Sequence, residues 1–191
     1  MKILNSKNKK FDKQIDLLLL KRKNKVKSNV VSVIKIIRDI KKNGDKAVLK
    51  YEKRFNKNKI IIPSSKQISN IISTLDKKVK KAIDLAYNRI YKFHSLQKFK
   101  NKLEYKYLPI DSVAIYVPGS TASYPSSVLM NAIPALVAGV KRIVMINPGN
   151  KGNQNPAVLY AAKKCNIKEI YSIGGPSVSY THLTLPTIAL V

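Results

Sequence analysis

The chain has 191 residues and is 45% hydrophobic, which is enough apolar content to build a globular core. Its formal net charge is +27, and no run of apolar residues approaches the roughly 18 that a transmembrane helix needs. The run Leu17–Leu20 is too short for the apolar part of a signal peptide, and the single Cys165 allows no disulfide within the chain. These features exclude a membrane protein and a disulfide scaffold, so we expect a cytoplasmic protein.

The beginning of the chain predicts two helical pieces. Residues 1–29 are rich in lysine and asparagine and have little apolar periodicity, which predicts a short helix followed by a solvated connector. From Val30 to Ile40, apolar residues repeat at three- and four-residue steps. This spacing predicts an amphipathic helix, and Asn43-Gly44 supplies its end.

Residues 30–111 predict a mainly helical region. The expected elements after its first helix are helices over residues 48–55, 65–75 (capped by Ser64 or Ser65) and 79–93, and short strands over Ile60–Ile62 and Leu103–Leu108. Each helix is expected to turn its periodic apolar residues toward the core.

Beyond Asp111, strands and helices alternate. Strands are expected at Val113–Val117, Arg142–Ile146 and Glu169–Ile173, and helices over Val128–Gly139 and residues 155–165. This βαβαβ order is typical of a parallel sheet with right-handed crossovers. The fold class is therefore α/β, with a basic, mainly helical region followed by a Rossmann-like nucleotide-binding segment over residues 112–176. Pro134 is expected to kink the first of the two helices or to mark a late start.

A glycine follows each expected strand, at Pro118-Gly119, Asn147-Pro148-Gly149 and Gly174-Gly175. Ligands of parallel sheets bind beyond these carboxyl ends, although glycine there is also ordinary turn chemistry. The G-x-G-x-x-G pattern of dinucleotide-binding folds is absent. The first turn continues into small hydroxylated residues, and Ser126 or Ser127 is expected to cap the next helix. A strand that leads through such a loop into a helix favours anionic or nucleotide ligands.

This stretch also resembles the YVPGG-x-A-x-x-x-S-x-V-L-M-x-x-x-P-A-x-x-A-G segment of histidinol dehydrogenases. The matching positions are Tyr116–Gly119, Ala122, Ser126 or Ser127, Val128–Met130, Pro134, Ala135, Ala138 and Gly139. Further matches are Asn43–Ala47, Tyr51, Phe55, Ala86, Asn88, Ile90, Phe93-His94, Gln97, Ile170 and Ile173–Gly175. The resemblance covers most of residues 30–176, and Ser120 departs from it where the family usually has a second glycine.

The resemblance implies a homodimeric enzyme that uses NAD and zinc. Such enzymes oxidise L-histidinol to L-histidine through an aldehyde, the last step of histidine biosynthesis. Tyr116 matches the tyrosine with which the family contacts NAD, and it is the one cofactor-binding residue that the resemblance carries over.

The resemblance assigns no catalytic and no metal-binding residue to this chain. The family's catalytic glutamate-histidine pair and its zinc ligands lie downstream of the motif matched by Gly174-Gly175. We therefore expect an N-terminal fragment in which residues 30–111 begin a domain that later sequence completes. By itself the chain is expected to oxidise no histidinol, to bind no stoichiometric zinc and to aggregate through uncovered apolar faces.

The last residues, 177–191, do not continue the family pattern. Val178–Thr187 resembles a translated transposase sequencing adapter, so the chain from about Ser177 onward is predicted to be non-native. His182 in this tail then has no functional meaning. The other histidine, His94, stands beside Phe93 at an expected helix end, where a capping or packing role is expected rather than that of a ligand or base.

The uneven charge leaves an alternative function open. Residues 108–191 hold six basic and two acidic residues, so most of the positive charge lies in residues 1–107. A basic half of this kind could bind nucleic acid or another polyanion. However, only five of the 37 basic residues are arginine, and the lysines are spread out rather than clustered with aromatic residues. We interpret them as a solvated surface and expect no specific nucleic-acid partner.

Overall fold

The computed structural model describes residues 11–98, 106–119, 124–149 and 152–175. Along this part of the chain the elements are α1 (Phe11–Asn43), α2 (Asp45–Phe55), α3 (Ser65–Ser73), α4 (Lys77–Ser95), β1 (Ser112–Tyr116), α5 (Pro125–Ala138), β2 (Arg142–Ile146), α6 (Pro156–Lys164) and β3 (Glu169–Tyr171). None of the helices in the described ranges is long and apolar enough to cross a membrane. Ser120 and the tail from Ser177 lie outside the described residues.

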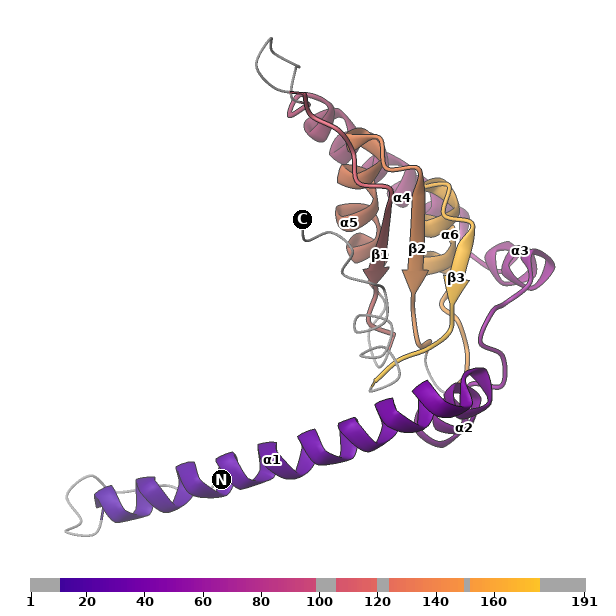
Figure 1. The fold of residues 1–191 in the computed structure, drawn as a ribbon. Helices are drawn as coiled ribbons and strands as arrows, with labels where there is room; N and C mark the ends of the chain where they lie inside the picture. The colour runs from indigo at the N-terminus through magenta and orange to yellow at the C-terminus, as the bar shows by residue number, and fades with distance from the viewer. Residues whose placement is uncertain (1–10, 99–105, 120–123, 150–151, 176–191) are drawn as a thin grey trace.

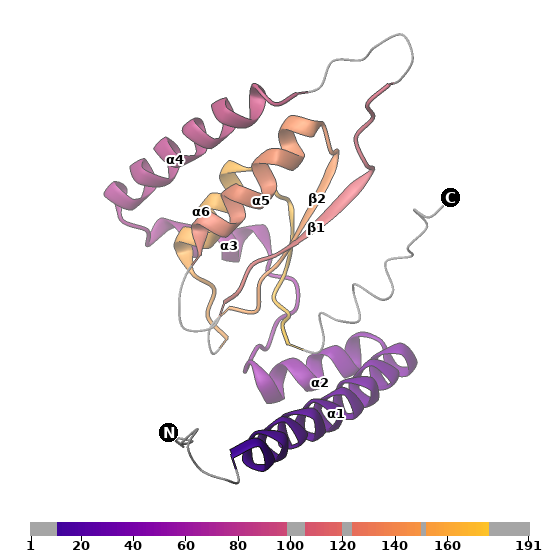
Figure 2. The ribbon, with the colours of Figure 1, turned by 90° about the vertical axis from the view of Figure 1, so that its left-hand side faces the viewer.

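The three strands form one parallel sheet, as the βαβαβ pattern predicts, and the strand order is β1-β2-β3. Helices α5 and α6 cover one face of this sheet, and α3 and α4 pack on the outer side of these two helices (Figure 2). The core between the sheet and the helices contains fully buried residues, among them Val117, Leu129, Ile133, Met145 and Leu159. The α/β fold class is confirmed.

The opposite face of the sheet is only partly covered. Ala114, Val144 and Tyr171 are half-buried there, and a hollow of about 260 Å³ runs over them. Toward the carboxyl ends of the strands, Ile146 and Ile173 are buried against α1 and α2. Figure 1 shows these two helices lying across that end of the sheet, with the start of α1 extending away from it.

Helix α1 corrects the expected short helix and connector, because it is continuous from Phe11 to Asn43. These 33 residues contain no glycine and no proline, and lysine is a good helix former. Polar composition therefore did not break the helix. Its end is as predicted: Gly44 follows with a φ of 54°, a backbone conformation that favours glycine.

Three other expectations about local structure are wrong. Ile60–Ile62 forms no strand, although the Ile61 carbonyl accepts a hydrogen bond from Ser172 N at 2.6 Å. Helix α5 begins at Pro125 rather than after Ser126 or Ser127, because proline suits the first helical position. Pro134 lies inside this continuous helix, so the late start is also wrong.

The helical faces agree with the predicted pattern in part. The Ser64 cap is confirmed, since its hydroxyl and the Gln67 side chain form a capping box at the start of α3. On α4, Ile83 is buried as expected, but Phe93 at the end of the stripe is 59% exposed. Cys165 is fully buried, and burial raises the pKa of its thiol to about 12.

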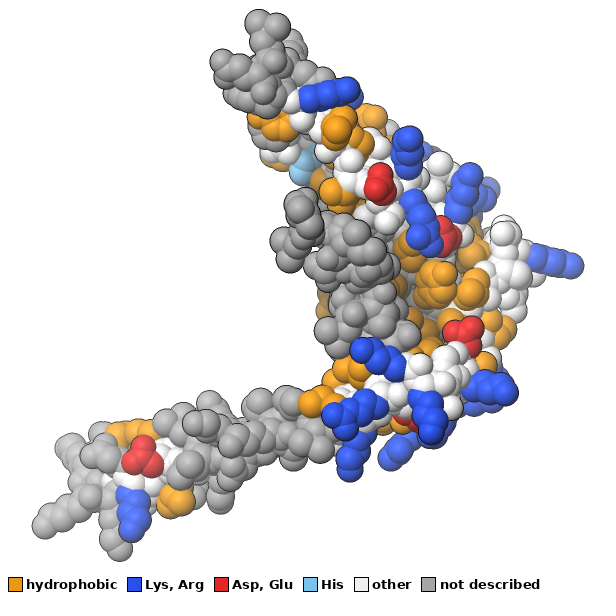
Figure 3. All heavy atoms as spheres, in the orientation of Figure 1, with side chains coloured by type: hydrophobic (Ala, Val, Ile, Leu, Met, Phe, Trp, Pro, Cys, Tyr) orange, Lys and Arg blue, Asp and Glu red, His pale blue; other side chains and the backbone are white. Residues whose placement is uncertain are grey.

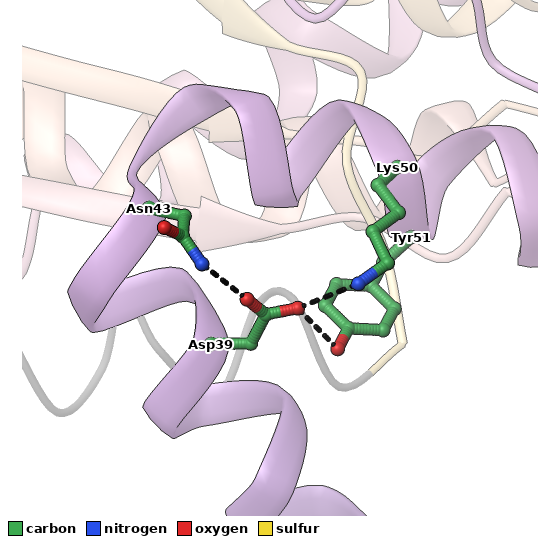
Figure 4. Close-up of polar contacts among 4 residues, drawn as sticks. All are labelled: Asp39, Asn43, Lys50 and Tyr51. Carbon is green, nitrogen blue, oxygen red and sulfur yellow. Dashed lines mark hydrogen bonds and ion pairs between the residues drawn. The ribbon is translucent and has the colours of Figure 1, made fainter.

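A polar cluster joins the two helices that lie below the sheet (Figure 4). Asp39 on α1 accepts hydrogen bonds from Tyr51 Oη at 2.7 Å, Lys50 Nζ at 2.9 Å and Asn43 Nδ2 at 2.6 Å. These donors, the Tyr51 hydroxyl first, lower the pKa of the Asp39 carboxyl from 3.8 to about 2. The carboxylate therefore fixes the angle between α1 and α2.

This cluster is expected to make stability depend on acid pH. Because the folded state lowers the pKa of Asp39, its contribution is complete above pH 3.8 and is lost as the pH falls toward about 2. Asp39→Asn should therefore be less stable than the unchanged chain at pH 7, and the difference should shrink below about pH 4. Urea unfolding followed by circular dichroism at several pH values measures it. A difference that stays constant down to pH 2 would contradict this role.

Candidate functional site at the carboxyl edge of the sheet

The loops that follow the three strands meet at the edge of the sheet that faces α2. Beyond the strands, Val117 N donates to Ile146 O at 2.8 Å and Asn147 N donates to Tyr171 O at 2.9 Å. The buried Asn147 side chain then donates from Nδ2 to Val117 O at 2.8 Å. The end of β1 and the end of β2 are thus tied together where a ligand is expected.

Two glycines at this edge let the loops pack closely. A Cβ on Gly119 would lie 2.6 Å from Gly149 N, and a Cβ on Gly174 would lie 2.4 Å from Pro148 Cβ. Both distances are shorter than van der Waals contact, so any side chain would push neighbouring loops apart. Gly175 differs, since a Cβ there would meet nothing within 4 Å. Gly119 and Gly174 therefore serve loop packing, whereas Gly175 borders open space.

A buried polar network lies beneath these loops, and the sequence did not predict it. Glu52 on α2 is 0% exposed, and Asn58 just after α2 is 3% exposed. Gly174 N donates to Glu52 Oε1 at 2.9 Å, and Asn58 Nδ2 lies 2.9 Å from Glu52 Oε2. The available signal was a glutamate next to Tyr51 on the apolar face of a helix, since carboxylates are rarely buried without partners.

Tyr116, the predicted NAD contact, is the last residue of β1. Its side chain lies on the face of the sheet opposite α5 and α6 and is 41% exposed, so a ligand at this edge can reach it. Burial raises the pKa of the phenol, and the Glu52 carboxylate raises it further. The hydroxyl is therefore protonated at neutral pH and suits hydrogen bonding and stacking rather than proton abstraction.

The start of α5 adds a second feature at the same edge. Its N-cap, Tyr124, makes no side-chain hydrogen bond to the first turn, and Pro125 follows at the first helical position. Backbone N–H groups at a helix start attract anions, because the helix dipole adds positive potential there. The edge therefore combines an accessible tyrosine with a helix start that the Tyr124 side chain does not cap.

The remaining candidates lie elsewhere. His94 is near the end of α4, where its Nδ1 lies 2.7 Å from Gln97 Oε1 and its ring meets Phe93 edge-on. These contacts are with neighbours at the same helix end, and a capping or packing role of His94 stays a prediction. Among the described ranges, no three His, Cys, Asp or Glu side chains are grouped so that they could bind one metal ion. Lysine and arginine side chains are distributed over several parts of the surface (Figure 3).

The sequence and the fold of this chain were compared with those of known proteins. The family described as histidinol dehydrogenase matches residues 19–179 of the chain. The chain belongs to the histidinol dehydrogenase family. It is 78% identical over 186 residues to a histidinol dehydrogenase of Pelagibacter ubique, an alignment that covers 93% of this chain and 44% of that protein. A relative from Agrobacterium fabrum is 42% identical over 167 residues, covering 80% of this chain and 39% of that protein.

A solved structure agrees with the sequence relatives. The crystal structure of histidinol dehydrogenase from Elizabethkingia anophelis has a TM-score of 0.72 and 37% sequence identity, covering 81% of this chain and 38% of that one. The chain thus spans less than half the length of these members of the histidinol dehydrogenase family. The family resemblance read from the motif at Tyr116 is confirmed.

Proposed function

We propose that this chain supplies the NAD-binding edge of an enzyme that oxidises L-histidinol to L-histidine. The observation that carries the proposal is the position of Tyr116: the motif residue lies half-exposed at the carboxyl edge of the parallel sheet. We further propose that the whole enzyme acts in the cytoplasm as a homodimer.

The residues at this edge fit a dinucleotide. NAD carries a pyrophosphate, which suits the start of α5, because Tyr124 offers no side-chain cap that would compete for the N–H groups. Its rings offer flat faces, which suit the exposed phenol of Tyr116. When bound, NAD accepts the hydride that leaves the carbinol carbon. This chain's part is to hold the cofactor at the sheet edge, where the ring of Tyr116 offers a flat contact face and its protonated hydroxyl can donate a hydrogen bond.

Zinc does not fit any site in the described part of the chain, because no suitable group of ligands is present there. Alcohol oxidation also needs a base that takes the hydroxyl proton. Tyr116 does not suit this task, since its raised pKa keeps the phenol protonated. We therefore assign neither zinc binding nor proton abstraction to these residues.

The test uses a chimera in which residues 1–175 of this chain replace the aligned part of the P. ubique enzyme, which is 78% identical. The chimera is expected to reduce NAD when histidinol and zinc are supplied. Tyr116→Ala should raise the KM for NAD about tenfold, whereas Tyr116→Phe should raise it less than about threefold if ring contact dominates. Steady-state kinetics at fixed histidinol measures both values.

Two controls separate binding from folding. Tyr107→Ala changes an exposed tyrosine that lies before β1, and the KM for NAD is expected to stay the same. Thermal unfolding monitors the fold of each variant. If the chimera folds but reduces no NAD with histidinol, or if Tyr116→Ala leaves the KM for NAD unchanged, the proposal is wrong.

A further inference from the structure

We propose that Glu52 is a positioning residue that holds the loop after β3 in the place that cofactor binding requires. This inference rests on the proposed function, because it takes the ligand of the sheet edge to be NAD. Glu52 itself does not touch the ligand. Its effect passes through the backbone of Gly174 and through Asn58.

The first argument is the cost of burying this carboxylate. Glu52 is completely buried, and the three groups that donate hydrogen bonds to its carboxylate, Gly174 N, Asn56 Nδ2 and Asn58 Nδ2, are all neutral. A buried charge costs free energy that neutral donors offset only when they are well placed. The distances of 2.7–2.9 Å show good placement. Loss of one oxygen acceptor would leave a buried N–H without a partner.

The second argument is what the network joins. Asn58 Nδ2 also lies 2.8 Å from Pro148 O after β2 and 2.8 Å from Ser172 O after β3. Glu52 and Asn58 together therefore tie the end of α2 to two of the three strand-end loops. The third loop is reached through Asn147, whose side chain donates to Val117 O. The network around Glu52 and Asn58 therefore helps to set the positions of the loops after β2 and β3, in addition to the hydrogen bonds between the ends of the strands.

The third argument is the electrostatic effect of Glu52 on Tyr116. Its charge adds to burial in raising the pKa of Tyr116, so the carboxylate lies close enough to influence that phenol electrostatically. Replacing Glu52 by a neutral side chain would move a loop of the edge and also change the potential at Tyr116.

The test is Glu52→Gln in the chimera described above. Glutamine has the same shape but offers one acceptor oxygen, so its NH₂ must face either Gly174 N–H or the amides of Asn56 and Asn58. We expect the KM for NAD to rise about tenfold, while kcat changes less than about threefold. Steady-state kinetics at saturating histidinol, below the unfolding temperature, measures the KM for NAD and kcat separately.

Two control variants separate the bond to Gly174 N from a general effect of removing a carboxylate or a donor. Glu169→Gln makes the identical change at the other end of β3, where the carboxylate pairs with Arg142 on the surface. Asn56→Ala removes a donor from Glu52 but leaves the bond to Gly174 N in place. Both are expected to keep the KM for NAD within about threefold of the unchanged chimera, because neither releases a strand-end loop.

A compensating variant tests the geometry directly. In Glu52→Gln/Asn56→Asp, the new carboxylate at position 56 can accept from the glutamine NH₂, so the glutamine oxygen remains available to Gly174 N. Asn58 Nδ2 loses its acceptor on residue 52 but keeps Pro148 O and Ser172 O as acceptors for its two N–H groups. We expect this pair to restore the KM for NAD to within about threefold. If Glu52→Gln alone does not fold, this double variant decides: restored folding and NAD binding support the inference, and their absence overturns it.

The outcomes distinguish this inference from the function on which it rests. A folded but unmodified chimera that reduces no NAD contradicts the proposed function. An active chimera in which Glu52→Gln leaves the KM for NAD within about twofold contradicts only the positioning role. An equal effect of Glu52→Gln and Asn56→Ala also contradicts it, because the bond to Gly174 N would then carry no special weight.

Discussion

Replacing Leu159 by alanine is expected to lower the free energy of unfolding of the chain by about 2–5 kcal/mol. Leu159 lies on α6, is 0% exposed and belongs to the core between the sheet and its covering helices. Truncation removes buried apolar surface and leaves a cavity that rigid neighbours fill only in part. Urea unfolding followed by circular dichroism measures the loss.

The control for this prediction is an exposed leucine at the end of a different helix. Leu96 follows α4 and is 82% exposed, so Leu96→Ala should change the free energy of unfolding by less than about 0.5 kcal/mol. Equal losses for the two variants would show that Leu159 does not lie in a packed core.

The second large effect is expected from Gly174→Ala. The new methyl group would lie 2.4 Å from Pro148 Cβ, so the loops after β2 and β3 would have to separate. We expect a loss of about 1–3 kcal/mol in the free energy of unfolding. In the chimera, the KM for NAD should rise as well, because the same shift weakens the bond between Gly174 N and Glu52.

Gly175→Ala provides the comparison for this steric effect. A Cβ there meets nothing within 4 Å, but the φ of 59° disfavours alanine. Its cost should therefore be that of backbone strain alone, about 1 kcal/mol. Urea unfolding of both variants gives the ranking. If Gly175→Ala proves the more damaging of the two, the close approach of Gly174 and Pro148 is not what fixes these loops.

Local pattern predicted much of the fold. The alternation of apolar strands and helices after Asp111 predicted the parallel sheet, and the Ser64 cap appears as expected. The errors have local causes as well. The lysine-rich composition of residues 1–29 predicts a connector, but α1 is continuous there because it contains neither glycine nor proline to interrupt it. At α5, the propensity of Pro125 for the first helical position outweighed the serines that follow it.

The buried network could not be predicted in the same way. Glu52 and Gly174 are 122 residues apart, and Asn58 and Ser172 are 114 apart. Nothing in either segment specifies the other, because hydrogen bonds between distant parts of the chain form only when the packing of α2 against the sheet brings them together. Sequence reasoning could mark Glu52 as unusual on an apolar helix face, but it could not name the partners.

The sequence by itself determined the family, the parallel α/β arrangement and the choice of Tyr116 as the candidate NAD contact, since these depend on periodicity and on a contiguous motif. The tertiary structure decided that Gly119 and Gly174 serve loop packing and that Glu52 and Asn58 join the ends of the strands. The physical reason is that short-range patterns encode which surfaces are apolar. Which buried polar groups meet depends on the three-dimensional packing of those surfaces.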